Sequence, residues 1–268
     1  MNKEDLVSVI MPTYNAGKYL ADSINSILNQ SYKNLELLIT DDASTDPTTL
    51  QLLQEFASKD NRVDILYLKE NHGAGFARNQ SIERAKGRYI AFCDSDDRWT
   101  TDKLEKQIAF MNKKKCALSC ASYIIFDGET QNEIGFCTAP KKITYGMMKR
   151  DNKVGCLTAI YDVQMLGRKF FMPTIRKRQD WALFLQIIRE CKVCYAYPEK
   201  PLAYYCMRRN SISSNKISLM KYNIAVYKEI LGFHPIKANL YFFTLFLPTY
   251  GAKILKRKFD SYTFTHQK

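Results

Sequence analysis

Apolar and polar residues alternate in blocks along the first hundred residues of the chain. Continuously apolar runs predict short strands at residues 6–11, 35–40, 63–68 and 89–93. Between these runs, apolar residues recur at helical spacing near residues 20–28, 50–57 and 74–85. Strands without a polar face are expected where helices cover both sides of a sheet. The pattern predicts an α/β fold with an open, twisted, mostly parallel sheet flanked by helices.

The regular alternation ends near residue 100. Further helices are predicted around residues 104–111 and 180–188, and further strands at 116–126, 193–197 and 202–207. Residues 127–175 show no clear period apart from a strand-like run at 156–161. Residues 216–256 are expected to be helical, and the chain contains no internal repeat or low-complexity linker. We therefore expect one large domain followed by a C-terminal helical extension.

Polar residues follow each of the first four predicted strands. These segments are Pro12-Thr13-Tyr14-Asn15, Asp41-Asp42-Ala43-Ser44, Asn71-His72-Gly73 and Asp94-Ser95-Asp96-Asp97. Sheets of this kind bind ligands at the carboxyl ends of their strands. The four segments therefore predict one binding site along a single edge of the sheet.

The acidic segment contains the most specific chemistry. Carboxylates at Asp94 and Asp96 are the hard oxygen ligands that Mg²⁺ and Mn²⁺ prefer, and these ions usually arrive with a phosphate. An ordinary acidic turn is the alternative, because Asp is favoured in turns. The place of the segment as the fourth polar strand end favours the metal site, with Asp97 expected to act only in the turn.

Composition and charge narrow the class of protein. The eight cysteines lie mostly in apolar stretches, so buried reduced thiols are favoured over a zinc site, and we expect a cytosolic protein without a signal peptide. The net charge of +13 is concentrated near the C-terminus, where Lys200 to Lys268 contain twelve Lys and Arg but only two acidic residues. An anionic surface is the expected partner of that segment, and no nucleic-acid partner is expected.

The ordered set of motifs resembles the family 2 glycosyltransferases, which have the GT-A (nucleotide-diphospho-sugar transferase) fold. The matching segments are residues 7–15, Asp41-Asp42 with Ser44-Thr45-Asp46, Gly75 with Ala77-Arg78-Asn79, Gly87-Arg88-Tyr89-Ile90, Asp94–Asp97 and, less sharply, Arg178-Gln179-Asp180-Trp181. The resemblance implies a GT-A domain over residues 1–215, with a nucleotide-sugar-binding half (1–100) and an acceptor half (101–215). The helical extension would occupy residues 216–268.

The resemblance also implies how the strand ends hold a nucleotide-diphospho-sugar, with a UDP-sugar favoured. Pro12, Thr13, Tyr14 and Asn15 would line the base and ribose pocket, Asp42 would accept hydrogen bonds from the base, Arg78 would contact the nucleotide or diphosphate, and Asp94 would meet the ribose or sugar. Asp96 would bind Mg²⁺ or Mn²⁺, which neutralises the departing diphosphate. Arg78 could instead bind carbonyls or surface carboxylates.

Asp180 is implied to be the base that deprotonates the acceptor hydroxyl. A single base opposite the leaving group implies inversion at the anomeric carbon. A carboxylate at a helix amino terminus is stabilised as the anion, which keeps it ionised but weakens it as a base. The alternative is that Asp180 only caps its helix, and the two roles are compatible.

The basic segment after the last predicted strand resembles the part of the family that closes over the diphosphate. Arg208 and Ser211 could supply that contact, Arg208 through paired hydrogen bonds to phosphate. Many relatives carry Arg where this chain has Cys206, so a solvated basic turn is an equal alternative.

The apolar tail also has two explanations. Residues 238–252 contain no charged residue, but they are shorter than the roughly twenty residues of a spanning helix, and Pro248 and Gly251 interrupt them. Four basic residues follow, namely Lys253, Lys256, Arg257 and Lys258. A helix lying on the anionic cytoplasmic face of the inner membrane suits this pattern, and a core helix packed on the domain is the alternative.

Together these features predict an inverting, non-processive glycosyltransferase that adds one sugar to a glycan acceptor. The acceptor would be lipid-linked or part of a surface polysaccharide of O-antigen or capsule type. The Gln-x-x-Arg-Trp motif and the multiple spanning helices of processive relatives are absent. One alternative is a sugar-phosphate nucleotidyltransferase, which shares the architecture but carries a Gly-rich basic loop where this chain has Pro12–Asn15. The other is a catalytically silent nucleotide-sugar-binding protein.

Overall fold

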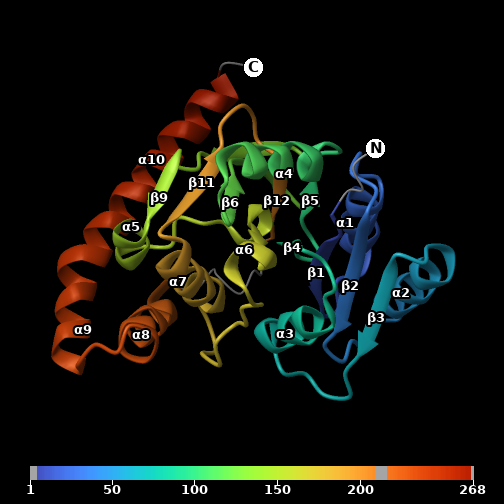
Figure 1. Ribbon diagram of the computed structural model, residues 1–268, viewed down its shortest axis with the longest axis horizontal. Coiled ribbons are helices and arrows are strands. Elements are labelled where there is room, and N and C mark those ends of the chain that lie inside the picture. Colours follow the sequence, from blue (N-terminus) through green and yellow to red (C-terminus); the bar gives the residue numbers. More distant parts are fainter. Residues whose placement is uncertain (1–4, 209–215, 267–268) are drawn as a thin grey trace.

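The computed structural model describes residues 5–208 and 216–266. Its largest layer is an eight-stranded sheet in the order β3-β2-β1-β4-β10-β6-β11-β9 (Figure 1). The four strands of the N-terminal half are parallel neighbours, namely β1 (Val7–Thr13), β2 (Leu35–Asp41), β3 (Val63–Tyr67) and β4 (Tyr89–Phe92). The predicted open, mostly parallel sheet is confirmed.

Helices pack on both faces of the sheet around β1, β2 and β4, which explains why these strands are mostly apolar. The expected cover on both faces is wrong for β3, an edge strand whose Asp64 and Tyr67 are exposed. One face is covered by α1 (Leu20–Leu28) with its preceding 3₁₀ turn (Gly17–Tyr19), by α2 (Pro47–Lys59) and by α4 (Lys103–Lys114). The other face is covered by α3 (Ala74–Arg84) and α7 (Gln179–Cys191). Successive side chains of a strand point to opposite faces. Val9 therefore packs in the first core, Ile10 packs in the second, and every residue of β1 is buried.

The C-terminal half adds further strands and a second sheet. β10 (Ile160–Asp162) lies antiparallel between β4 and β6 (Leu118–Ala121), and β11 (Val193–Tyr197) and β9 (Lys142–Thr144) complete that edge. The smaller sheet has the order β5-β12-β7-β8, formed by Arg98–Trp99, Ala203–Met207, Tyr123–Asp127 and Glu133–Cys137.

The single strand predicted over residues 116–126 is wrong, because β6 and β7 belong to different sheets. The chain leaves the large sheet at Ser122. There the carbonyl oxygen accepts a hydrogen bond from the Leu202 N–H (3.1 Å), and the side-chain oxygen accepts one from the Ala139 N–H (3.0 Å). These bonds come from segments far away in the sequence, so the local apolar run could not reveal the break.

The segment without a clear sequence period is built from short elements. Besides β8, β9 and β10 it contains α5 (Tyr145–Arg150), a 3₁₀ turn (Cys156–Thr158) and α6 (Val163–Leu166). The strand-like run at 156–161 is therefore a turn followed by the start of β10. Elements of three to six residues are too short to display a helical or strand period.

The C-terminal extension forms α8 (Lys216–Ala225), a π-helical turn (Val226–Ile230), α9 (Pro235–Tyr241), a second π-helical turn (Phe242–Phe246) and α10 (Leu247–His266). These helices pack along the outer side of the C-terminal half (Figure 1). The expected interruption at Pro248 and Gly251 is wrong, since α10 runs through both. Pro248 is the second residue of α10, next to the second π-helical turn, where the α-helical hydrogen-bond pattern is already broken and a missing N–H costs little.

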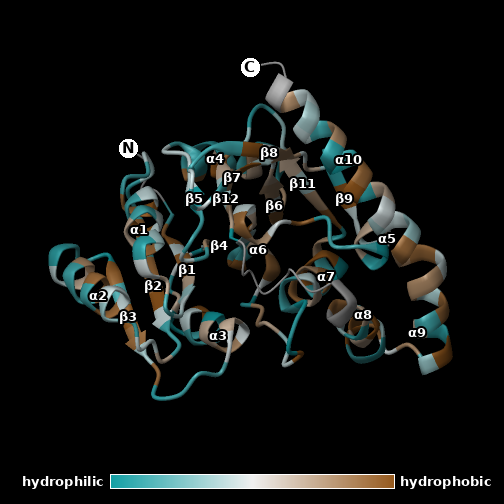
Figure 2. Ribbon diagram, turned by 180° about the vertical axis from the view of Figure 1, so that it is seen from behind, coloured by the Kyte–Doolittle hydropathy of each residue, from teal (hydrophilic) through white to brown (hydrophobic). Residues whose placement is uncertain are grey.

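The extension has one buried side and one exposed side. Tyr227 and Phe246 contact Trp181 of α7, with ring centroids 5.6 and 5.5 Å away, and Phe242 is also fully buried. Figure 2 shows apolar and polar residues side by side along α9 and α10. Within the described ranges, no helix combines the length and the apolar character needed to cross a bilayer.

Candidate active site

The polar strand ends meet at one edge of the large sheet. In the parallel register Thr13 at the end of β1 pairs with Asp41 at the end of β2, which pairs with Tyr67 of β3. The acidic segment follows β4, whose Phe92 pairs with Ile10 of β1. The loops after these four strands therefore surround one region, as the sequence pattern predicts.

The end of β1 presents an unused hydroxyl and an exposed ring. Pro12 and Thr13 are buried, and the Thr13 Oγ1 atom has no hydrogen-bond partner among the described residues. The Tyr14 side chain is about half exposed. Asn15 differs from both, because its Oδ1 atom accepts hydrogen bonds from the N–H groups of Thr45 (2.8 Å) and Asp46 (3.0 Å). Thr13 thus carries a buried hydroxyl without a partner among the described residues and Tyr14 an exposed ring, whereas Asn15 secures the loop after β2.

The two neighbouring aspartates after β2 have separate partners. Asp41 accepts hydrogen bonds from the N–H and hydroxyl of Ser44 and so shapes its own turn. Asp42 accepts one bond from the His72 N–H (2.8 Å) and one from the Gly73 N–H (2.7 Å). Each Asp42 oxygen retains a second acceptor site. Asp42 therefore joins β2 to the loop that enters α3 and can still accept from a ligand.

Arg78 of α3 is a buried cation that contacts the acidic loop. Its Nη2 atom donates to Asp94 Oδ1 at 2.5 Å, and its Nε atom is buried without a hydrogen-bond partner among the described residues. Burial alone would lower the pKa of the guanidinium, but the negative charge of Asp94, with a contribution from Asp180, raises it. Arg78 is thus a permanent positive charge with an unused donor, close to both carboxylates.

The other two acidic residues of the loop differ from each other. Asp97 is fully buried and accepts a hydrogen bond from the Cys206 N–H (2.8 Å), which fastens the loop to β12. Asp96 pairs instead with Arg208, whose Nη2 atom lies 2.5 Å from Asp96 Oδ2. Burial and the nearby Asp94 charge raise the pKa of Asp96, and Arg208 opposes that rise. Asp97 thus has a structural role, whereas the charge of Asp96 is paired with the partly exposed side chain of Arg208.

The donor set suits a divalent ion that arrives with a diphosphate. Among residues 5–208 and 216–266, no three His, Cys, Asp or Glu side chains surround a common point. Mg²⁺ is usually held by only one or two carboxylates, with substrate phosphates completing its coordination. Asp96, with Asp94 beside it, fits that pattern. Ser211, the second residue predicted to contact the diphosphate, lies outside the described residues.

Asp180 lies in the first turn of α7, where that helix meets the start of α3. The N-cap residue is Arg178, so the alternative that Asp180 caps the helix is wrong. The neighbouring Gln179 fills the space over Gly75, since a Cβ atom there would clash with the Gln179 side-chain amide. Gly75 thus allows α3 and α7 to approach each other. One Asp180 oxygen accepts a hydrogen bond from Asn152 Nδ2 at 2.8 Å.

Sequence reasoning missed Asn152 and Lys103. Asn152 lies in the segment without a clear period, and no local pattern marks it. Lys103 is the first residue of α4. The one sequence signal for it is that a charged residue stands on the helix face that also carries Leu104 and Ile108. The Lys103 Nζ atom is completely buried, has no hydrogen-bond partner among the described residues and lies 4.0 Å from the Trp99 ring centroid. Burial lowers the pKa of Lys103 to about 7.

Replacing Lys103 by methionine is expected to stabilise the protein at pH 6–7 by roughly 2 kcal/mol. The reason is that the unfavourable free energy of burying the charge exceeds the favourable energy of its cation–π contact with Trp99. Between the folded pKa of about 7 and the ordinary value of 10.5, the unfolded chain binds the extra proton, so wild-type stability rises with pH. The advantage of Lys103→Met should therefore shrink towards pH 10. Urea unfolding of this variant and of Lys113→Met, an exposed position on the same helix, measures both effects. Destabilisation at pH 6–7 would contradict the expectation.

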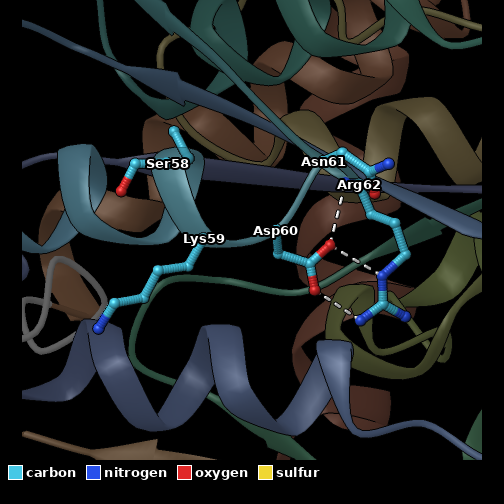
Figure 3. Close-up of a pocket in the computed structure, with 6 residues that line it drawn as sticks. Ser58, Lys59, Asp60, Asn61 and Arg62 are labelled. Atoms are coloured by element: carbon cyan, nitrogen blue, oxygen red, sulfur yellow. Dashed lines mark hydrogen bonds and ion pairs between the residues drawn. The ribbon is translucent and has the colours of Figure 1, made fainter.

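A surface hollow elsewhere does not belong to this site. It is lined by Ala57, Ser58, Lys59, Asp60, Asn61 and Arg62 (Figure 3). These residues lie between the end of α2 and the start of β3, at the amino edge of the sheet. Within the hollow the Asp60 carboxylate is held by Arg62, with an Nη2–Oδ2 distance of 2.7 Å. The hollow is therefore occupied by a local ion pair on the edge opposite the strand ends described above.

Comparisons with known proteins agree with this arrangement. The sequence model described as glycosyl transferase family 2 matches residues 8–171. TuaG of Bacillus subtilis, named for teichuronic acid biosynthesis, is 43% identical over 238 residues, which cover 89% of this chain and 93% of that protein. WfgD of Escherichia coli is named as a UDP-Glc:alpha-D-GlcNAc-diphosphoundecaprenol beta-1,3-glucosyltransferase. It is 38% identical over 216 residues, or 81% of this chain and 83% of that protein.

Solved structures share the fold at lower identity. TarS residues 1–349 of S. aureus, in complex with UDP-GlcNAc, superimposes with a TM-score of 0.66 at 21% identity, covering 88% of this chain and 70% of that chain. The mannosyltransferase PcManGT of Pyrobaculum calidifontis, in complex with GDP-Man and Mn²⁺, gives 0.62 at 16% identity, covering 95% and 75%. Both are GT-A type transferases, so the predicted fold class is confirmed.

Proposed function

Since this chain belongs to glycosyl transferase family 2, we propose that it moves one sugar from a nucleoside-diphosphate donor to a hydroxyl of a lipid-linked glycan, with inversion at the anomeric carbon. A UDP-sugar is the favoured donor, because WfgD is named for UDP-Glc. Family membership decides against the nucleotidyltransferase alternative. Residues 1–100 would bind the donor and residues 101–215 the acceptor.

The proposal depends mainly on one observation, the meeting of two arginine-paired carboxylates with Asp180 at one sheet edge. Arg78 pairs with Asp94, and Arg208 pairs with Asp96. The negative charge of Asp180 contributes to the raised pKa of the Arg78 guanidinium. A diphosphate entering this region would meet two arginine side chains, the carboxylate of Asp94 and the proposed metal ligand Asp96, with a candidate base near them.

The chemistry of each side chain suits transfer with inversion. The Thr13 hydroxyl, the Tyr14 ring and Asp42 would bind the nucleoside, and the unused Nε of Arg78 would donate to a phosphate or to the sugar. A divalent ion at Asp96 would neutralise negative charge on the leaving diphosphate. Asp180 would take the proton from the acceptor hydroxyl as its oxygen bonds to the anomeric carbon and the bond to diphosphate breaks.

Product analysis tests the proposal. Purified protein is incubated with Mn²⁺, UDP-glucose or UDP-GlcNAc, and a synthetic lipid bearing α-linked GlcNAc diphosphate, the acceptor type in the name of WfgD. The expected products are UDP and a lipid carrying one additional β-linked sugar. Pyrophosphate release would indicate nucleotidyl transfer. Donor binding without any product over a panel of lipid-linked acceptors would favour the silent binding protein.

The exposed side of the C-terminal extension supports attachment to a membrane surface. Ile236, Leu240, Phe243 and Leu247 recur at helical spacing and are 75%, 61%, 54% and 37% exposed. The exposed basic residues Lys256, Arg257 and Lys258 continue along α10. An apolar strip beside positive charge suits the interface of an anionic bilayer. We therefore propose peripheral attachment to the cytoplasmic face of the membrane that contains the acceptor.

Replacing Leu240 and Phe243 together by glutamate is expected to weaken binding to vesicles at least tenfold, because two apolar anchors are lost and two repelling charges are added. Sedimentation with vesicles of phosphatidylethanolamine containing about one third phosphatidylglycerol measures the effect. The control is Ile134→Glu with Met165→Glu, which makes the same change at two exposed apolar residues on β8 and α6. Equal binding by the two double variants would contradict the proposed surface.

A further inference from the structure

A chain of polar contacts connects the C-terminal helix to Asp180. Lys253 of α10 extends its ammonium group to the loop after α5, where Nζ donates to the Asn152 carbonyl oxygen at 2.6 Å. The same Nζ lies 3.1 Å from Asp151 Oδ2. Asp151 is buried and also pairs with Lys153 at 3.0 Å. Two lysines, one from a helix about a hundred residues further along the chain, thus hold this loop.

The held loop places the Asn152 side chain in a single orientation. Its Oδ1 atom accepts a hydrogen bond from the Val154 N–H at 3.1 Å, so its amide nitrogen must point the other way. That nitrogen donates to Asp180 Oδ2 at 2.8 Å. Carboxylate groups rotate easily about their terminal torsion, and a hydrogen bond on one oxygen restricts this rotation. Among the residues that the structure describes, the Asp180 Oδ1 atom accepts no hydrogen bond.

We propose that Asn152 is a positioning residue for Asp180, and that Lys253 holds Asn152 in place. The inference rests on the proposed role of Asp180 as the base. With Oδ2 engaged by Asn152, Oδ1 is presented in a constant direction to the acceptor hydroxyl. Orientation of this kind lowers the barrier because little freedom is lost when the reacting groups meet. The C-terminal helix is then part of the catalytic machinery as well as the proposed membrane anchor.

A mutant cycle separates this role from a general effect on structure. Asn152→Asp keeps the acceptor for Val154 but replaces the donor to Asp180 with a repelling oxygen, and it is expected to lower kcat about 30-fold with KM for UDP-glucose within twofold of wild type. Lys253→Met should lower kcat about fivefold, whereas Lys253→Arg, which keeps the positive charge, should have a kcat within twofold of wild type.

The double variant Asn152→Asp/Lys253→Met should be no slower than Asn152→Asp alone, since Lys253 acts through Asn152. The lipid acceptor is dispersed in detergent, so membrane docking does not contribute.

Exposed residues of the extension provide the matched controls. Asn239→Asp and Lys228→Met make the same chemical changes away from the loop and should leave kcat unchanged. A second measurement needs no acceptor: the side-chain amide signals of Asn152 in a ¹⁵N correlation spectrum should shift in Lys253→Met and in Asp180→Asn, but not in Lys228→Met.

The outcomes distinguish this inference from the proposed function. The role of Asn152 would be overturned if Asn152→Asp kept kcat within twofold of wild type. It would also be overturned if the Asn152 amide signals did not shift in Lys253→Met or in Asp180→Asn. Additive losses in the double variant would overturn the link through Lys253. Transfer retained by Asp180→Asn would instead remove the base assignment on which both depend.

Discussion

Asp180→Asn is expected to lower the rate of sugar transfer about a thousandfold while donor affinity changes less than twofold. A positioned general base contributes about 10²- to 10⁴-fold to the rate, and an amide cannot take the proton of the acceptor hydroxyl. The substitution preserves shape, and the new amide oxygen can still accept the hydrogen bond from Asn152. Initial rates of UDP release with the lipid-linked acceptor, and isothermal titration with UDP-glucose and Mn²⁺, measure the two quantities.

Asp22→Asn is the matched control for this experiment. Asp22 also lies in the first turn of a helix, but in α1, with an exposed side chain that approaches Arg98 at 3.5 Å. This variant should transfer sugar at the wild-type rate. If Asp180→Asn loses less than tenfold in rate, another group accepts the proton, and the assignment of the base is wrong.

Asp96→Asn is expected to remove most of the effect of the metal on donor binding. In the wild type, chelation of divalent ions should weaken UDP-glucose binding and lower kcat/KM about 100-fold, because charge on the diphosphate is no longer neutralised. An amide at position 96 is a much poorer ligand for Mn²⁺ than a carboxylate. The variant should therefore show the low kcat/KM of the chelated wild type, and Mn²⁺ should raise it less than threefold.

Two further variants define what this result means. Asp64→Asn removes an exposed carboxylate that pairs with Arg84 at the other end of the sheet, so it should keep the full response to Mn²⁺. Asp94→Asn tests the neighbouring carboxylate, which pairs with Arg78. A normal response to Mn²⁺ in Asp96→Asn and none in Asp94→Asn would transfer the role of metal ligand to Asp94.

The N-terminal half of the fold, residues 1–100, could be predicted because the signals that define it are local in the sequence. β1, β2 and β4 are short, mostly apolar runs with a core on either face, and Asp94 and Asp96 come shortly after β4, whereas β3 at the sheet edge is only partly buried. Parallel strands place their carboxyl ends on one edge, so the polar segments had to gather there. The same reasoning could not separate Asp41 from Asp42, because the difference lies in their partners, Ser44 for one and the His72–Gly73 backbone for the other.

The C-terminal half, residues 101–215, was predictable only in part, because its elements are short and depend on distant contacts. The division of residues 116–126 between two sheets is set at Ser122 by bonds from Leu202 and Ala139. The tail shows the same dependence. Its apolar composition was evident, but only packing against Trp181 distinguishes the buried Phe246 from the exposed Phe243.

The sequence by itself determined the sheet of the N-terminal half, its polar edge and the family of the enzyme, since apolar period and motif order are properties of neighbouring residues. Only the tertiary structure decided how Asp180 is held. Asn152 and Asp180 are 28 positions apart, and Lys253 is 101 positions from the loop it supports. Hydrogen bonds over such separations follow from how α10 and the loop after α5 pack together. No spacing rule encodes that packing.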